Sequence, residues 1–425
     1  MLKKNTIVFL FQRKTYFWRM NYKVIDIFSG CGGMSWGLHK AGFEVVAALD
    51  SWDIALKTFK VNHPKAAIFN GDIRTIDPNV VMGQLNLQRG ELDCLVGGPP
   101  CQGFSKNVPA AYRFFDDERN QLFSNYLDYV EALFPKVVVM ENVAEIYNAF
   151  NGQIRHQVLD RLEKLGYQTT VKVLFGPDYG IPQRRSRCFF FASRMGTPPE
   201  FPEPTHSKKV ASNLFDHTPQ YISAWAAISD LPSLQNGEGD LEMVYDKAVS
   251  NEYQNFARNG NKILFDHKTR ELRETQLARI KSLKAGEGLK ELPDHLRPKS
   301  GYSGAYGRLD FVNVAPTITR WVFHPGSGRF GHPKDDRLIT IREAARIQSF
   351  TDDFRFAGTY IEKAHQIGNA VPSLFMYHLA KNIKKCLKVS VDSARMAKAA
   401  FTPLTYFCLF KLKRVDNFSR KWKNA

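Results

Sequence analysis

Two features that would point to common classes of protein are missing from this 425-residue sequence. Its six cysteines form no Cys-x-x-Cys pair, which argues against a zinc site and a disulfide framework and fits a reducing cytoplasm. No apolar run approaches the 18 or so residues that a membrane-spanning helix needs. We therefore expect a cytoplasmic protein that holds no metal and crosses no membrane.

Net positive charge is scarce in the body of the chain, although the whole sequence carries a formal charge of +17. Residues 1–20 carry +5 and residues 381–425 carry +10, so only +2 remains for residues 21–380. The total charge is therefore weak support for nucleic-acid binding. A basic cleft would have to come from local clusters, such as the three arginines within residues 184–187.

The two ends differ from the rest of the chain. Residues 1–20 mix basic and large apolar residues, but no small-residue cleavage site follows their short apolar run. We expect residues 1–19 of this extension to lie outside the native protein, with translation starting at Met20. Residues 389–425 form a basic tail, for which we expect a mobile, solvated segment. A nonspecific phosphate-binding arm is the alternative for this tail.

Signals for strands and helices alternate over residues 21–192. Strands are expected at residues 24–28, 44–49, 68–69, 92–96, 137–140, 168–174 and 188–192. Helices are expected at residues 34–41, 52–61, 120–133 and 154–165. Repeated strand–helix units with apolar strands predict an α/β fold with a doubly wound, mostly parallel sheet.

The alternation stops at a proline-rich stretch that begins at residue 198. The chain from 193 to 363 is irregular, polar and rich in loops, and we expect a second, smaller domain there. Within it, residues 339–349 show the pattern of an amphipathic helix. Residues 364–388 are expected to supply a long helix that returns to the first domain, which spans residues 21–192.

The string Gly-Gly-Pro-Pro-Cys-Gln-Gly-Phe-Ser at residues 97–105 comes directly after a buried-strand signal. Its first two glycines allow the chain to leave the strand sharply, and its two prolines stiffen the turn. Cys101 would thus be held at the carboxyl edge of a parallel sheet, where such folds place their chemistry. This arrangement suits a nucleophile; a structural cysteine in a proline turn is the alternative.

A second loop suits a nucleotide-like ligand. Gly30, Gly32 and Gly33 follow the first expected strand and open a helix, although the usual dinucleotide fingerprint is incomplete. Asp50 ends the second expected strand, and its carboxylate could accept hydrogen bonds from both hydroxyls of a ribose. The alternative for Asp50 is a cap at the start of the next helix.

Together these motifs resemble those of the cytosine-C5 DNA methyltransferases of bacterial restriction-modification systems. They occur in the usual order of that family and span roughly residues 22–388. The matching segments are residues 26–33, 97–105, 141–143, 183–187, 342–346 and 368–372. The resemblance implies the fold of methyltransferases that depend on S-adenosylmethionine, with a target-recognition region after residue 193.

The resemblance also implies the methyl-donor site. S-adenosylmethionine would be the donor, bound at the glycine-rich loop and Asp50. Phe28 would pack near its sulfonium, Asp72 would face its adenine amine, and Asn369 would close the site. No metal is part of this chemistry.

For the base, the resemblance implies that the thiolate of Cys101 adds to C6 of cytosine. Glu141 would bind the base and protonate its N3, Arg187 would contact O2, and Arg185 would help to position the site. Asn142 would orient the loop that carries Cys101. Without the motifs, Glu141 would be read as a carboxylate at a helix start and the arginines as surface residues.

The implied function is that of a DNA (cytosine-5-)-methyltransferase acting on a flipped cytosine in a specific duplex sequence. We expect a monomer whose partners are double-stranded DNA and a cognate restriction endonuclease that acts separately. An RNA cytosine-5 methyltransferase is one alternative, against which the Gln-Gly-Phe-Ser string after Cys101 argues. A noncatalytic nucleic-acid-binding regulator is another, but it would be expected to lack Cys101 or Glu141.

Overall fold

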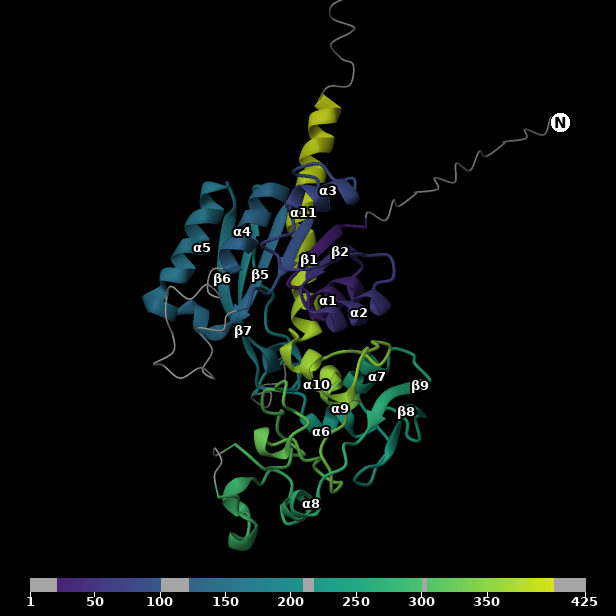
Figure 1. Cartoon of the computed structure of the whole chain (residues 1–425). Helices are drawn as coiled ribbons and strands as arrows, with labels where there is room; N and C mark the ends of the chain where they lie inside the picture. The colour runs from purple at the N-terminus through teal and green to yellow at the C-terminus, as the bar shows by residue number, and fades with distance from the viewer. Residues whose placement is uncertain (1–20, 101–121, 209–217, 300–303, 401–425) are drawn as a thin grey trace, which may run out of the picture.

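The computed structural model describes residues 21–100, 122–208, 218–299 and 304–400, with only the backbone from residue 389 onward (Figure 1). A seven-stranded sheet in the order β3-β2-β1-β4-β5-β7-β6 forms its upper part. Only β7 runs against its neighbours β5 and β6 in this sheet. The strands are β1 (Lys23–Ile27), β2 (Glu44–Asp50), β3 (Ala67–Asn70), β4 (Cys94–Gly97), β5 (Val137–Val143), β6 (Gln168–Phe175) and β7 (Ser186–Ser193).

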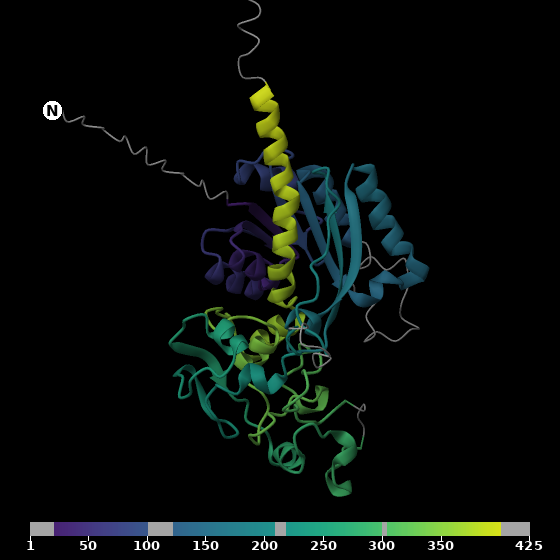
Figure 2. The same ribbon diagram turned by 180° about the vertical axis from the view of Figure 1, so that it is seen from behind.

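Helices cover both faces of this sheet. Successive strand residues point to opposite faces, so Val24 packs in one apolar cluster with Phe375, while Ile25 packs in another with Val130. The first face carries α1 (Gly33–Lys40) and the long α11 (Ser373–Ala400), and Figure 2 shows α11 running along it. The second face carries α3 (Pro78–Gln84), α4 (Leu122–Leu133) and α5 (Gln153–Lys164), while α2 (Asp53–Asn62) packs on β2 and β3. The predicted doubly wound, mostly parallel α/β fold is confirmed.

Most expected elements lie within one to three residues of the observed ones, and one difference matters for the site. The strand expected to end at residue 140 continues as β5 to Val143. The antiparallel β7 causes this extension, because it pairs with Glu141, Asn142 and Val143 beyond the point where β4 has ended. The helix α3 was not predicted.

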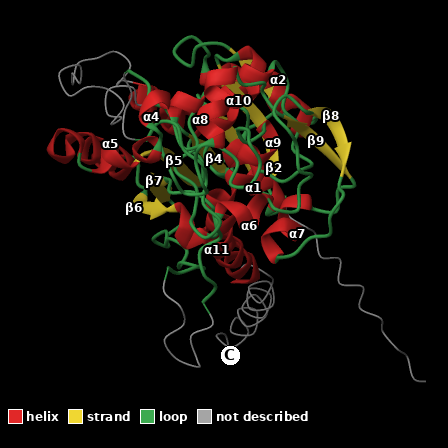
Figure 3. Cartoon of the chain, turned by 90° about the horizontal axis from the view of Figure 1, so that it is seen from below, coloured by secondary structure: helices red, strands yellow, loops and turns green. Residues whose placement is uncertain are grey.

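A second part of the molecule lies below the sheet, at the edge where β5 ends (Figures 1 and 3). The interval expected to be irregular contains short regular elements instead, including a two-stranded antiparallel sheet. They are α6 (Ala224–Ile228), β8 (Gly239–Val244), α7 (Glu252–Arg258), β9 (Ile263–Lys268), α8 (Glu274–Lys281), α9 (Ile341–Ile347) and α10 (Tyr360–Asn369). The division into domains stays a prediction, and its boundary after residue 363 falls inside α10.

The helix expected to be amphipathic is buried on every side, so that prediction was wrong. All seven residues of α9 are buried. Its charged side chains are paired inside the protein: Arg346 contacts Asp230 at 2.5 Å and Asp352 at 2.6 Å, and Glu343 contacts Arg337 at 2.8 Å. Charged residues at helical spacing normally mark a solvent face, but here their partners from other segments take the place of water.

In the part of the chain that the structure describes, no helix combines the length and the apolar character needed to cross a membrane.

Candidate active site

The glycine-rich loop after β1 is tied to the end of β2 by Asp50. One carboxylate oxygen of Asp50 accepts a hydrogen bond from the Gly30 N–H at 2.7 Å, and the other accepts one from the Trp52 N–H at 2.8 Å. Burial raises the pKa of Asp50, and the backbone N–H groups of Gly30, Trp52 and Ser51 oppose that rise. Asp50 therefore holds the loop and the start of α2 together, although the residue that caps α2 is Trp52.

The three glycines of this loop have different reasons to be glycine. A Cβ on Gly33 would lie 2.3 Å from the carbonyl oxygen of Val371, and a Cβ on Gly32 would lie 2.9 Å from the ring of Phe59. Both positions are thus filled by the protein itself. Gly30 has left-handed φ of 52° and no atom within 4 Å of its Cβ position, so it borders open space.

Phe28 adopts a left-handed conformation with φ of 57° between β1 and the glycine-rich loop. Such a backbone is unfavourable for a bulky residue, by a cost on the order of 1 kcal/mol or more, and strained residues of this kind gather at ligand sites. The strain marks Phe28 as a residue held in place by its surroundings. Its predicted contact with the donor's sulfonium fits this position and stays a prediction.

Asp72 lies two residues beyond β3, and its carboxylate already has a partner. The guanidinium of Arg74 binds it through Nη2 at 2.6 Å and Nε at 3.0 and 3.1 Å. These hydrogen bonds lower the pKa of Asp72 to about 2. A contact with an adenine amine, as predicted, would have to share this carboxylate with Arg74.

The turn between α10 and α11 joins the two predicted subsites. Asn369 ends α10 with an exposed side chain, between Gly368 and Ala370. The carbonyl oxygens of Gly368 and Ala370 both accept hydrogen bonds from the Arg185 guanidinium at 3.0 Å. Because the next residue along the chain, Val371, packs on the glycine-rich loop, Asn369 lies between that loop and the arginine motif.

Glu141 and Arg187 form an ion pair across two neighbouring strands, with 2.7 Å between Oε1 and Nε. The other carboxylate oxygen lies 2.9 Å from the position that a Cβ on Gly98 would take, so Gly98 leaves room for it. Burial raises the pKa of Glu141, while Arg187 and Arg185 oppose the rise. The pair therefore lies against the loop that leads to Cys101, and its acid keeps a proton to higher pH than an ordinary glutamate.

Asn142 secures the same loop, since its Nδ2 donates a hydrogen bond to the Pro99 carbonyl at 3.1 Å. This contact is the one expected for a residue that orients the loop. Cys101 itself, and the basic and aromatic segment 105–120 beyond it, lie outside the described residues, which reach Pro100 on this side.

Arg185 makes its hydrogen bonds to backbone carbonyls of the second part of the molecule and of the α10–α11 turn, not to Glu141. Its guanidinium is buried and donates to the carbonyl of Ile318 at 2.9 Å as well as to those of the α10–α11 turn. Its Nε has no hydrogen-bond partner among the described residues. Gln183, two residues earlier, is also buried and bonds to the backbone of Ile318 and Ile347, which agrees with a structural role.

Asp26 was missed by the sequence reasoning. It stands in β1 among buried apolar residues, and only one of its oxygens has a partner among the described residues, the hydroxyl of Ser35 at 2.6 Å. Burial raises the pKa of Asp26 to about 7. The signal was present in the sequence, because an acidic residue in the middle of an apolar strand needs a reason to be there.

Comparison with known proteins gives a consistent result. The model of the family described as C-5 cytosine-specific DNA methylase matches residues 22–385. Type II methyltransferase M1.HphI of Haemophilus parahaemolyticus is 31% identical, over 88% of this chain and 90% of that protein. Type II methyltransferase M.DdeI of Desulfomicrobium norvegicum is 32% identical, over 85% of this chain and 88% of that protein. A solved structure described as a prophage-encoded DNA modification methyltransferase (E. coli) matches with a TM-score of 0.69 at 25% identity, over 86% of this chain and 99% of that chain.

Proposed function

We propose that this chain, which belongs to the C-5 cytosine-specific DNA methylase family, is the modification enzyme of a bacterial restriction-modification system. The family predicted from the motifs is confirmed, and the reaction is transfer of a methyl group from S-adenosylmethionine to C5 of cytosine in DNA. Support for the biological role comes from relatives named as type II methyltransferases, which match this chain over most of their length. A cognate endonuclease that acts as a separate protein, and a monomeric state, belong to the same proposal.

Cys101 is the proposed nucleophile. Its thiolate adds to C6 of the cytosine, which makes C5 electron-rich enough to attack the methyl group. After the transfer C5 loses its proton, and the thiolate leaves C6 as the ring double bond re-forms. The observation that carries this assignment is the Glu141–Arg187 pair, which lies against Gly98 three residues before the thiol.

Glu141 is the proposed acid for N3 of the base. Because burial raises its pKa, Glu141 can hold a proton and share it with N3 as negative charge develops there. Arg187 binds Oε1 of Glu141, and we assign it the role of donor to O2 of the same ring. Arg185 acts as a positioning residue, since its hydrogen bonds go to backbone carbonyls rather than toward Glu141.

S-adenosylmethionine supplies the methyl group, and the loop after β1 fits it by the open space at Gly30. We assign the donor to a site formed by Phe28, Asp50, Asp72 and Asn369 together with the glycine-rich loop. Asp50 would bind the ribose while it keeps its bonds to the Gly30 and Trp52 N–H groups. None of this chemistry is possible inside a stacked duplex, so the cytosine has to leave the helix and enter the space beside Glu141.

A methylation assay with labelled donor tests the proposal on duplex DNA and on RNA. We expect label at C5 of cytosine in DNA, at one sequence that long-read sequencing would identify. Cys101→Ser should abolish turnover and leave donor binding nearly unchanged, because the nucleophile is separate from the glycine-rich loop. Label on RNA alone would favour the RNA enzyme, no label on either would favour a noncatalytic regulator, and a Cys101→Ser rate within tenfold of the parent would refute the nucleophile.

A further inference from the structure

Positive charge is concentrated in one segment of the second part. Residues 268–329 hold twelve Lys and Arg against six Asp and Glu, a net charge of +6. Since residues 21–380 as a whole carry +2, the rest of that range carries −4. The local cluster that a nearly neutral body would need in order to bind a polyanion therefore exists, and it lies in this segment.

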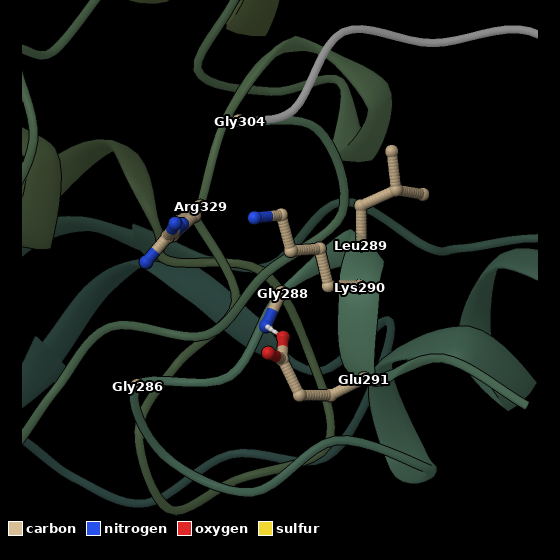
Figure 4. Close-up of a pocket in the computed structure, with 7 residues that line it drawn as sticks. All are labelled: Gly286, Gly288, Leu289, Lys290, Glu291, Gly304 and Arg329. Atoms are coloured by element: carbon tan, nitrogen blue, oxygen red, sulfur yellow. Dashed lines mark hydrogen bonds between the residues drawn. The ribbon is translucent and has the colours of Figure 1, made fainter.

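A pocket of about 360 Å³ opens within this segment (Figure 4). It is lined by Gly286, Gly288, Leu289, Lys290, Glu291, Gly304 and Arg329. The lining has a single apolar side chain, whereas sites for small apolar ligands are lined mostly by hydrophobic and aromatic groups. A polar, cationic lining of this kind fits an anionic group better than an apolar ligand.

The side chain of Arg329 packs against the backbone of two glycines beside this pocket. A Cβ on Gly307 would lie 2.5 Å from the Cγ of Arg329, and a Cβ on Gly288 would lie 3.3 Å from its Nε. The side chain thus rests on backbone that carries no side chains of its own. Its exposed guanidinium makes no hydrogen bond or ion pair with any residue that the structure describes. A cation that is already positioned and lacks a partner loses little freedom when it binds an anion.

Lys290 adds a second positive group. Figure 4 shows its side chain directed toward Arg329, while the Glu291 carboxylate turns back to accept the Gly288 N–H at 2.8 Å. That hydrogen bond, with Arg329 and Lys290 nearby, lowers the pKa of Glu291. Arg329 and Lys290 therefore bring two positive charges to the same space. The one carboxylate among the lining residues, Glu291, is already bound to a backbone N–H, so an anion can bind between the two cations.

Within this segment, the stretch from Arg320 to Arg329 begins next to the turn that Arg185 binds. A Cβ on Gly368 would lie 2.1 Å from the backbone nitrogen of Arg320, so Arg320 packs directly against the residue that precedes Asn369. The exposed guanidinium of Arg320 lies 5.3 Å from the ring centroid of Trp321, whose side chain is 46% exposed. Exposed cationic and aromatic groups therefore continue from that turn toward the pocket.

We propose that Arg329 and Lys290 bind one backbone phosphate of the DNA duplex that flanks the flipped cytosine, with the chain between Arg320 and Arg329 running along the DNA backbone. The inference rests on the proposed function and adds to it a contact that positions the duplex without reading its sequence.

The experiment measures binding of a fluorescent DNA duplex of arbitrary sequence to the full chain over a series of salt concentrations. Arg329→Gln and Lys290→Gln should each make the slope of log affinity against log salt less negative by about one, and weaken binding by a similar factor on any sequence. The matched control is Lys262→Gln, because Lys262 is an exposed lysine of the same part that lies outside the pocket and outside the segment 268–329. Its slope should equal that of the parent.

Unchanged slopes in both pocket variants would overturn the inference, and so would a loss that depends on the sequence of the duplex, which would indicate a base contact. Lys290 is exposed, so its variant decides the matter even if Arg329→Gln lowers the melting temperature. Methylation by the parent chain separates the two proposals. A parent that binds DNA with the expected slopes but does not methylate it would remove the proposed function and leave the phosphate contact standing.

Discussion

At the scale of single residues, Arg185 and Arg187 show how two side chains of one motif divide their work. Arg187 lies in β7 and pairs with Glu141, whereas Arg185 precedes that strand and joins three carbonyls of the second part. Side chains two residues apart on a fully extended chain would share a face. The two side chains have different partners because β7 begins at Ser186, so that Arg187 lies in the strand and Arg185 lies in the segment before it.

Asp26 is the residue with the clearest expected response to pH. Its folded pKa of about 7 lies above the usual value near 4, so the folded protein binds a proton more tightly than the unfolded chain. Stability should therefore fall as pH rises from about 4 to 7, because the unfolded chain ionises first. Asp26→Asn removes this dependence. In the parent, the free energy of unfolding in urea should fall between pH 5 and pH 8, and in the variant this fall should be smaller by roughly 2 to 4 kcal/mol.

The control for Asp26→Asn is Asp53→Asn, which removes an exposed carboxylate that pairs with Lys57 at 2.8 Å on the surface of α2. A parent whose free energy of unfolding is equally large at both pH values would contradict the raised pKa. If Asp53→Asn changed the pH dependence as much as Asp26→Asn, the buried position of Asp26 would not be the cause.

At the scale of elements, the close packing of α1 on α11 depends on a glycine in the middle of a helix. A Cβ on Gly37 would lie 2.1 Å from the Ser373 carbonyl oxygen and 2.9 Å from the Tyr377 nitrogen. Gly37→Ala should therefore lower the free energy of unfolding by about 1 to 3 kcal/mol or more, as overpacking does. It should also weaken donor binding, since the turn before α11 packs on the glycine-rich loop.

Gly83 provides the matched control, because it is also helical but has no atom within 4 Å of its Cβ position. Gly83→Ala should raise the free energy of unfolding by up to about 1 kcal/mol. Urea unfolding and calorimetric titration of the donor product measure both effects. Equal stabilisation by the two substitutions would show that the helices are free to separate at Gly37.

Elements were predictable from sequence where local pattern and final environment agree. Central strands such as β4 and β5 are buried and largely apolar on both faces, and were found for that reason. The prediction of a solvent-facing side for α9 was wrong because its arginines and glutamate are buried with partners such as Asp230, more than one hundred residues away in the sequence. The site was predictable as a set of residues, since Glu141, Asn142 and Arg187 do meet at the cysteine loop. The space that Gly98 leaves for Glu141, and the buried hydrogen bonds of Arg185 to backbone carbonyls, depend on packing that no short motif encodes.

At the scale of the whole molecule, target choice is predicted to reside between residues 198 and 301, but this segment is not separable from residues 302–356. Arg346 is buried against Asp230, and Arg308 donates to the Ile280 carbonyl at 3.1 Å. Exchange of 198–301 with a relative that lacks an acidic residue at the position of Asp230 should leave Arg346 without this partner. That loss costs about 3 to 5 kcal/mol and should lower the melting temperature markedly.

Exchange of residues 198–356 carries both sides of these contacts and should keep the fold while it transfers the target sequence of the relative. Thermal unfolding and long-read mapping of methylated sites test the two chimeras side by side. An active 198–356 chimera that still modifies the parent's target would place specificity elsewhere. A 198–301 chimera as stable as the parent would show that the buried contacts tolerate exchange.

The contact of α1 with α11 also sets an order of events during synthesis. The glycine-rich loop and α1 emerge from the ribosome early, but their partners come from the far end of the chain. The Cys31 thiol donates a hydrogen bond to the Gln366 carbonyl at 3.8 Å, and the Lys384 ammonium donates one to the Ala41 carbonyl at 2.5 Å. At typical elongation rates of 5 to 20 residues per second, these partners arrive about 15 to 75 s later. A nascent chain should therefore carry an uncovered glycine-rich loop for most of its synthesis. Newly induced cells should gain methylation only after whole chains have been released, and chains that stop short of α11 should contribute none.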